Sequence, residues 1–449
     1  MHLIPNHTRE TELCEALGID SVQDLFSDIP DGLRIDGLKL PPGEPERALV
    51  GRLRRLLGKN RTYLDMPIFL GGPNKPQHVP ASVRAVAHRQ ELINAYTPYQ
   101  PEVSQGILQI LFEYQSLMAD ITRMEVVNAS MYDGHTALGE AGLMAVRATR
   151  NRDRVLVPEH MSWQKRSVLE NYTRGVGLKI ESYAFDDASG RTDIDDLQGR
   201  LGPDVCGVHI ENPNHFGVFE QDAKAIGEAV HDAGALFIMG TDPTSLGVCA
   251  PPGALGADIV VGEASAFGGA PAAGGPHLGL FGATEALVRK MPGRIIGATH
   301  DEDGKRGYVM TLQAREQHIR RSKATSNICS NETLLASQAA IHLSLLGRRG
   351  LRDMGLQNLA AGAKLRDTLA AGGLSPRFDG AHYNDVVTAV GDGDAMHRAL
   401  LGADIHGGQR LGRDVPRLSD CMLWGASPIH GDADFDALRE ALCHIEVVA

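Results

Sequence analysis

Apolar and polar residues alternate in blocks through the middle of the chain, and these blocks predict a succession of helices and strands. Runs rich in valine and isoleucine predict buried strands at 125–127, 154–158, 205–210, 235–242 and 257–262. A helix is predicted from Ser104 on, with a buried stripe formed by Ile107, Leu111, Tyr114, Met118 and Ile121. Such alternation is typical of a mainly parallel sheet covered on both faces. We therefore expect an α/β domain over residues 78–330.

The two ends of the chain have different patterns. Residues 1–77 predict a helical arm with short helices at 8–17, 21–26 and 47–57. This arm has too little apolar surface to fold alone, so we expect it to wrap the main body or a partner. Residues 331–449 predict a smaller α+β domain, with a helical stretch at 332–346 and strands at 383–390 and 420–424.

Composition excludes several classes of function. The net charge of −12 disfavours nucleic acid or an anionic membrane as the main partner. The six cysteines are scattered, without the paired spacing of zinc or redox sites, and the 18 histidines show no metal-binding spacing. We find neither a secretory leader nor a run of about 18 apolar residues. The sequence predicts a soluble cytoplasmic protein without a metal site.

The strands at 235–242 and 257–262, with the glycine-rich stretch 267–282, outline most of a pyridoxal-phosphate (PLP) pocket. Asp242 would keep the pyridine nitrogen protonated, so that the ring can accept electrons; alternatively, it begins a turn. A PLP enzyme also needs a Schiff-base lysine, which belongs directly after the second strand. Residues 263–269 read EASAFGG and contain no lysine. This frame without its covalent anchor indicates a chain that works with a catalytic partner.

Three further motifs leave alternatives open. The stretch 128–136 precedes an alanine-rich helix predicted at 138–150, where the N-terminus suits a phosphate; the alternative is simple N-capping by Asp133 or Ser130. His209 and His215 could stack on a ring or be structural histidines. Residues 313–323 predict one charged helix with cations at its C-terminal end, and the alternative to a functional role for these charges is that they form a solvated face of that helix.

Together these segments resemble one family, the glycine dehydrogenase (decarboxylating) P-protein of the glycine cleavage system. The similarity is to its N-terminal half, which in many bacteria is a separate alpha subunit (subunit 1). The motifs are YTPYQPEVSQG (96–106), NASMYDG (128–134), DPTSLG (242–247), GADIVVGE (256–263), GGPHLG (274–279) and TLQAREQHIRRSKATSN (311–327). The resemblance covers nearly the whole chain. It implies a fold-type I, aspartate-aminotransferase-like PLP fold with a smaller C-terminal domain.

The resemblance also implies a division of labour between subunits. Ser265 stands at the position of the PLP lysine, so the cofactor would be held by a beta subunit in an α2β2 tetramer, with none covalently bound to this chain. The reaction implied is oxidoreductive glycine decarboxylation, with transfer of the aminomethyl group to the lipoyl H-protein. The resemblance places a vestigial cofactor pocket at Ser130, His135, Thr136, Asp242 and Ser265. It places loops of the active-site face at Tyr96, Thr97, Tyr99, Gln100, His277, Lys323 and Asn327.

Three segments depart from the family pattern. They are 71–78, where relatives usually carry a GAGxYDxY-type loop, PNHF at 213–216 in place of the common PNFF, and 264–273. Because they fall near the implied active-site face, they leave one alternative open: a specialised paralogue that acts on another amino acid or in a biosynthetic pathway. A non-catalytic scaffold that binds a partner or carrier protein is the remaining alternative.

Overall fold

A seven-stranded sheet forms the centre of residues 62–449 in the computed structural model, which describes residues 7–35, 37–73, 75–269, 275–325 and 328–445. The strand order is β2-β8-β7-β6-β5-β3-β4. Neighbours among β3 to β7 run parallel, whereas β8 is antiparallel to both β7 and β2. The strands are β2 (Val126–Val127), β3 (Arg154–Pro158), β4 (Lys179–Tyr183), β5 (Val205–Glu211), β6 (Leu236–Thr241), β7 (Ile259–Glu263) and β8 (Gly279–Ala283).

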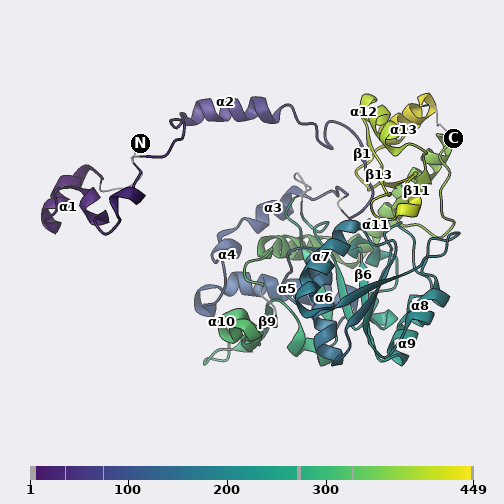
Figure 1. Cartoon of the computed structure of the whole chain (residues 1–449), viewed down its shortest axis with the longest axis horizontal. Helices are drawn as coiled ribbons and strands as arrows, with labels where there is room; N and C mark the ends of the chain where they lie inside the picture. The colour runs from purple at the N-terminus through teal and green to yellow at the C-terminus, as the bar shows by residue number, and fades with distance from the viewer. Residues whose placement is uncertain (1–6, 36, 74, 270–274, 326–327, 446–449) are drawn as a thin grey trace. The chain divides into compact units, whose positions relative to one another are not determined.

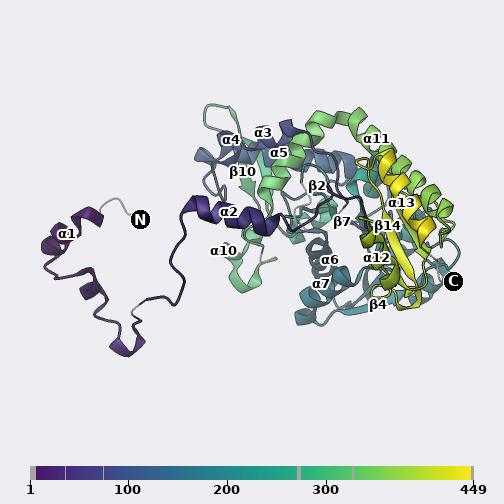
Figure 2. The same ribbon diagram turned by 90° about the horizontal axis from the view of Figure 1, so that it is seen from above.

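Helices cover both faces of this sheet because adjacent strand residues point in opposite directions. Phe237 and Met239 of β6 pack in the core shared with α5 (Gln105–Thr122), α9 (Ala223–Asp232) and α11 (Thr333–Ala371). Ile238 packs on the opposite side, with α6 (Gly134–Thr149) and α7 (Trp163–Thr173). Figure 2 shows α5 and α11 on one side of the sheet and α6 and α7 on the other. The strands are buried on both faces, as their continuous apolar runs predict.

The C-terminal part of the chain builds a second, smaller sheet in the order β11-β14-β13, drawn in yellow-green in Figure 1. Its core includes Phe69, Leu365 and the fully buried Trp424, whose indole N–H donates to Thr388 Oγ1 at 2.8 Å. The elements are β11 (Asp385–Ala389), β13 (Gln409–Arg410), β14 (Cys421–Gly425), α12 (Gly393–Gly402) and α13 (Asp432–His444), and β1 (Ile68–Phe69) pairs with β12 (His406–Gly407).

Residues 1–61 form a unit of their own. It contains α1 (Glu10–Leu17) and α2 (Glu46–Leu57), and Gly18 ends α1 in the left-handed conformation, with φ at 65°. Residues 62–77 belong to the second unit. The division at 77 and 330 into an arm, a large domain and a small domain stays a prediction, as does the role of the arm.

The remaining elements surround the sheet. They are α3 (Ala81–Ala87), α4 (Gln90–Ile93), α8 (Ile194–Arg200), α10 (Gln317–Arg320) and the antiparallel pair β9 (Ile295–His300) and β10 (Arg306–Thr311). In the described part of the chain, no helix is both long enough and apolar enough to cross a membrane.

The prediction of a single helix at 313–323 is wrong. The structure breaks this segment into short 3-10 turns on either side of α10, with Glu316 extended and Arg321 at a φ of 52°. The cause is tertiary: the buried Arg315 turns inward and its guanidinium donates to the carbonyl oxygens of Met291 and Gly293. Most of the other predicted helices and strands are found, with ends shifted by a few residues. The helix predicted at 332–346 is the first part of α11, which continues to Ala371 beyond a kink at Gly347, and the helix predicted at 21–26 is a 3-10 helix, Val22–Phe26.

Candidate functional site

A cavity of about 120 Å³ lies at the carboxyl ends of β5, β6 and β7. Parallel strands bring these ends to one edge of the sheet, which is where open α/β sheets form ligand sites. The starts of α6 and α7 line its sides, and the segments around Lys75 and Tyr383 line it from distant parts of the chain. We call it the strand-end cavity. Its charged and histidine residues are Lys75, His135, Lys165, Glu211, His215, Asp242, Glu263, His277 and Asp385.

Two lysines that line this cavity are ion-paired. Lys165, on α7, bonds the carboxylate of Glu211, which also receives His209 Nε2 at 3.2 Å. Burial alone would raise the pKa of Glu211, but Lys165 and His209 hold it well below its usual value. Lys75 Nζ lies 2.8 Å from Asp385 Oδ2, and these side chains are 5% and 11% exposed. Each lysine charge is therefore matched by a carboxylate of the chain itself.

Sequence reasoning missed both lysines as lining residues. Glu211 lies 46 residues from Lys165, and Asp385 lies 310 residues from Lys75. No local spacing in the sequence could therefore predict either pair. The one available signal was that Lys75 falls in the departing segment 71–78.

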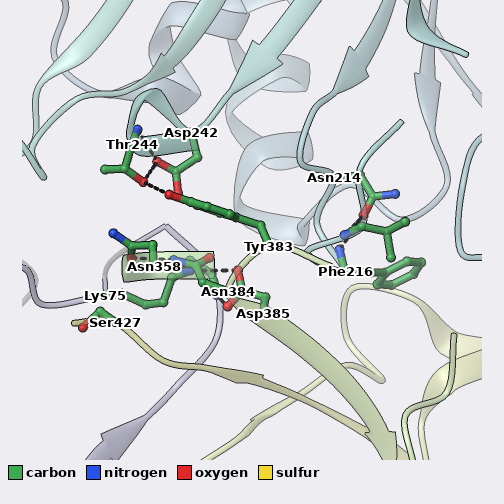
Figure 3. A network of polar contacts seen from close by, with 12 residues as sticks. Lys75, Asn214, Phe216, Asp242, Thr244, Asn358, Tyr383, Asn384, Asp385 and Ser427 are labelled. Atoms are coloured by element: carbon green, nitrogen blue, oxygen red, sulfur yellow. Dashed lines mark hydrogen bonds and ion pairs between the residues drawn. The ribbon is translucent and has the colours of Figure 1, made fainter. Parts of the chain in front are cut away.

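Asp242 ends β6 and lines the strand-end cavity, but its carboxylate serves a turn. Its Oδ1 accepts hydrogen bonds from the backbone N–H of Thr244 at 2.9 Å and from its hydroxyl at 2.7 Å. The hydroxyl of Thr244 lies 3.1 Å from that of Tyr383, which comes from the smaller C-terminal part. Figure 3 shows this chain of contacts beside the Lys75–Asp385 pair. The geometry matches the turn alternative for Asp242.

The start of α6 is capped from within the chain. Asp133 Oδ1 accepts the N–H of Thr136 at 2.6 Å, and Thr136 Oγ1 receives the N–H of Asp133 at 3.1 Å. This capping box begins the helix at Gly134, earlier than predicted. Ser130 does not cap the helix; its hydroxyl donates to Asn331 at 2.8 Å.

The carboxylate of Glu263, at the end of β7, also lies at the start of α6. Its Oε2 accepts the N–H of Gly134 at 3.1 Å, and its Oε1 accepts the N–H groups of Ser265 and Leu278 at 3.1 and 2.8 Å. His277 Nδ1 lies 3.5 Å from Oε2, and this contact raises the pKa of His277.

The residues present do not fit a bound PLP. A cofactor phosphate would need the α6 N–H groups and cationic side chains, yet the N–H of Gly134 is taken by Glu263 and that of Thr136 by Asp133. Both lysines of the described lining are paired with carboxylates. Ser265, at the expected lysine position, offers no amine.

The predicted site residues fall into two groups. His135, Asp242 and His277 line the strand-end cavity, and burial lowers the pKa of His135. Ser130, Thr136 and Ser265 are not among its lining residues but lie in the segments just beside it.

Five of the predicted loop residues of the active-site face do not line the strand-end cavity. The hydroxyl of Tyr96 donates to Ser330 at 2.5 Å, and the ring of Tyr99 meets His318 edge-on at 5.2 Å. None of the described members of this set other than His277 lines the strand-end cavity, and Asn327 lies outside the described residues. The described members that do not line this cavity are Tyr96, Thr97, Tyr99, Gln100 and Lys323.

The three departing segments meet at the strand-end cavity. Each contributes lining residues: Gly72, Pro73, Lys75 and Gln77 from the first, Pro213, Asn214 and His215 from the second, and Ala266 from the third. The side chain of His215 is 7% exposed and its Nε2 lies 3.9 Å from Asp414 Oδ1. The three segments that depart from the family pattern therefore all contribute to the lining of the strand-end cavity.

Comparison with known proteins decides the family. The sequence profile described as "GDC-P: Glycine cleavage system P-protein" matches residues 1–417. The chain is 48% identical over 444 residues to the probable glycine dehydrogenase (decarboxylating) subunit 1 of Thermococcus onnurineus, covering 98% of both chains. The chain belongs to the glycine cleavage system P-protein family. The P-protein resemblance found in the sequence motifs is confirmed.

A further relative and a solved structure of a P-protein support the same family assignment. A probable glycine dehydrogenase (decarboxylating) subunit 1 from Geobacillus kaustophilus is 43% identical, covering 95% of this chain and 94% of its own. The crystal structure of a glycine decarboxylase (P-protein) of the glycine cleavage system, in inhibitor-bound form, superposes with a TM-score of 0.91 at 40% identity over 99% of both chains. A sphingosine-1-phosphate lyase from Burkholderia pseudomallei, with a TM-score of 0.68 at 12% identity, shares the fold alone. The predicted fold class is confirmed.

Proposed function

We propose that this chain is the subunit without the Schiff-base lysine in a PLP-dependent glycine decarboxylase of the glycine cleavage system. The observation that carries the proposal is its end-to-end similarity to proteins named glycine dehydrogenase (decarboxylating) subunit 1, at 48% identity over 98% of both chains. A protein named subunit 1 implies a second subunit. Ser265, in place of a lysine after β7, supports the assignment of the Schiff base to that partner.

The proposal includes the cofactor and the partners. PLP, held by the partner subunit, supplies the electron sink for decarboxylation. An α2β2 assembly and the lipoyl H-protein, as acceptor of the aminomethyl group, complete the proposed system. The six cysteines are free, which supports a reducing, cytoplasmic location.

In this scheme the chain's own residues have a structural task. The Asp242–Thr244–Tyr383 contacts join the end of β6 to the C-terminal part. The Lys75–Asp385 pair joins the segment around Lys75 to β11, and the Lys165–Glu211 pair joins α7 to the end of β5. They hold the surface of the strand-end cavity in one arrangement, and none of them is proposed to take part in a chemical step.

The test is reconstitution. The chain is co-expressed with its lysine-bearing partner, and exchange of labelled bicarbonate into the carboxyl carbon of glycine is measured with H-protein present. We expect exchange only when both subunits are present. Equal exchange by the partner alone would refute the subunit role and favour the scaffold alternative.

A substrate panel addresses the paralogue alternative. The same assay with alanine and serine in place of glycine measures the amino acid preference of the pair. The departing segments 71–78 and 213–216 line the strand-end cavity, which keeps this comparison informative. Faster exchange with another amino acid would replace glycine as the substrate.

A further inference from the structure

Glu263 occupies the place in this fold that suits an anion. Its two carboxylate oxygens receive the N–H groups of Gly134, Ser265 and Leu278, at distances between 2.8 and 3.1 Å. Gly134 is the first residue of α6, so its N–H points out of the positive end of the helix dipole. His277 adds an imidazole 3.5 Å away. The N–H of Gly134 is a donor of the kind that a bound phosphate uses at a helix N-terminus, and the N–H groups of Ser265 and Leu278 converge on the same carboxylate.

The carboxylate is held there as an ion. Burial opposes its charge, yet the hydrogen bonds from His277 and from the N–H of Leu278 outweigh burial and lower the pKa of Glu263. The side chain is 11% exposed. A buried charge of this kind is stable only where fixed donors surround it.

The backbone at this point leaves little room for a larger group. A Cβ atom at Gly134 would lie 3.0 Å from the carbonyl carbon and oxygen of Gly262. One added at Gly279 would lie 2.4 Å from the carbonyl oxygen of Asp133. The start of α6 is therefore packed closely against the ends of β7 and β8, with the Glu263 carboxylate between the donors.

We propose that Glu263 is a built-in anion that fills the phosphate site of the inherited cofactor pocket. The subunit then excludes PLP by occupancy as well as by the loss of the lysine. This inference rests on the proposed assignment of the cofactor to the partner subunit. It also predicts that the site is latent: removing the carboxylate exposes its donors to a free anion.

The experiment uses the full chain and inorganic phosphate as the probe. Glu263→Ala removes the carboxylate, and Glu302→Ala, which removes an exposed carboxylate from the turn after β9, is the matched control for the change in net charge. Phosphate binding is measured by titration calorimetry and by the thermal midpoint as phosphate replaces chloride at constant ionic strength. We expect Glu263→Ala to bind phosphate about tenfold or more tightly than wild type, with a matching rise of its midpoint. The control should behave as wild type does.

Two results would show that Glu263 does not fill a phosphate site. Equal phosphate affinity of wild type and Glu263→Ala overturns the inference, as does an equal gain in the Glu302→Ala control. If Glu263→Ala does not fold in chloride, it is refolded in phosphate. Recovery only in phosphate supports the inference, and failure in both anions overturns it.

This readout is independent of the exchange assay. If Glu263→Ala gains phosphate binding but the wild-type chain supports no glycine exchange with its partner, the proposed function is refuted and the role of Glu263 stands. If the wild-type chain supports exchange but Glu263→Ala gains no phosphate binding, the role of Glu263 is refuted and the proposed function stands.

Discussion

The Lys75–Asp385 ion pair offers a sharp test of how the strand-end cavity is held together. Lys75→Met keeps most of the side-chain volume and removes the charge. Asp385 then retains the hydrogen bond that its Oδ1 accepts from the N–H of Gly72 at 3.3 Å. The carboxylate is left buried in the second unit without its cation.

The expected loss follows from burial. The side chains are 5% and 11% exposed, so solvent screens them little. Removing one partner of a buried pair costs about 3–5 kcal/mol of unfolding free energy, because the remaining charge is uncompensated. Replacing both partners, as in Lys75→Met with Asp385→Asn, should recover most of this loss.

The loss should also depend on pH. Burial raises the pKa of Asp385, and Lys75 counteracts this rise. Without Lys75 the pKa of the folded state rises further above that of the unfolded chain. The variant then loses stability as pH rises through the folded-state pKa, so its deficit should be smaller in acid than at neutral pH.

Urea denaturation measures these differences in a Trp163→Phe background. The chain has two tryptophans, so Trp424, in β14 beside Asp385, becomes the sole fluorescent indole. Lys179→Met, which breaks an ion pair of side chains 68% and 49% exposed, is the control and should change little. A loss for Lys75→Met no larger than this control, or a double variant as unstable as the single one, would refute the reasoning.

Three further predictions concern residues outside the cavity. Burial raises the pKa of Glu220 to about 7, so the unfolding free energy of wild type should fall as pH rises from the pKa of this group in the unfolded chain through about 7. Glu220→Gln should remove this fall, which amounts to at most about 3 kcal/mol, in urea titrations at several pH values. Thr388→Val leaves the buried indole N–H of Trp424 without its partner and should cost about 1–3 kcal/mol by the same denaturation assay. Gly279→Ala places a Cβ 2.4 Å from a backbone oxygen and should cost about 1–3 kcal/mol, whereas Gly199→Ala, with open space around it, should cost nothing in thermal unfolding.

Local patterns determined much of this fold from the sequence. The valine- and isoleucine-rich runs identified β5, β6 and β7 because a strand buried on both faces needs continuous apolar residues. The alternative of capping by Asp133 was available for the same reason, since a cap acts within three residues. The absence of a lysine after β7 could also be read from the sequence alone, because a Schiff base needs an amine at one position in the chain.

Only the tertiary structure decided which groups of the chain pair with one another around the strand-end cavity and at the start of α6. Glu263 meets Gly134 across 129 residues, and Lys75 meets Asp385 across 310. Charge pairing at such separation has no periodicity or spacing in the sequence, because it depends on which strand ends and loops the fold brings to one edge. Arg315 shows the same limit: its local sequence favours a helix, and its buried bonds to Met291 and Gly293 break that helix. The sequence thus determined that the anchor is absent, and the packing of α6 against β7 decided that a carboxylate stands in the phosphate's place.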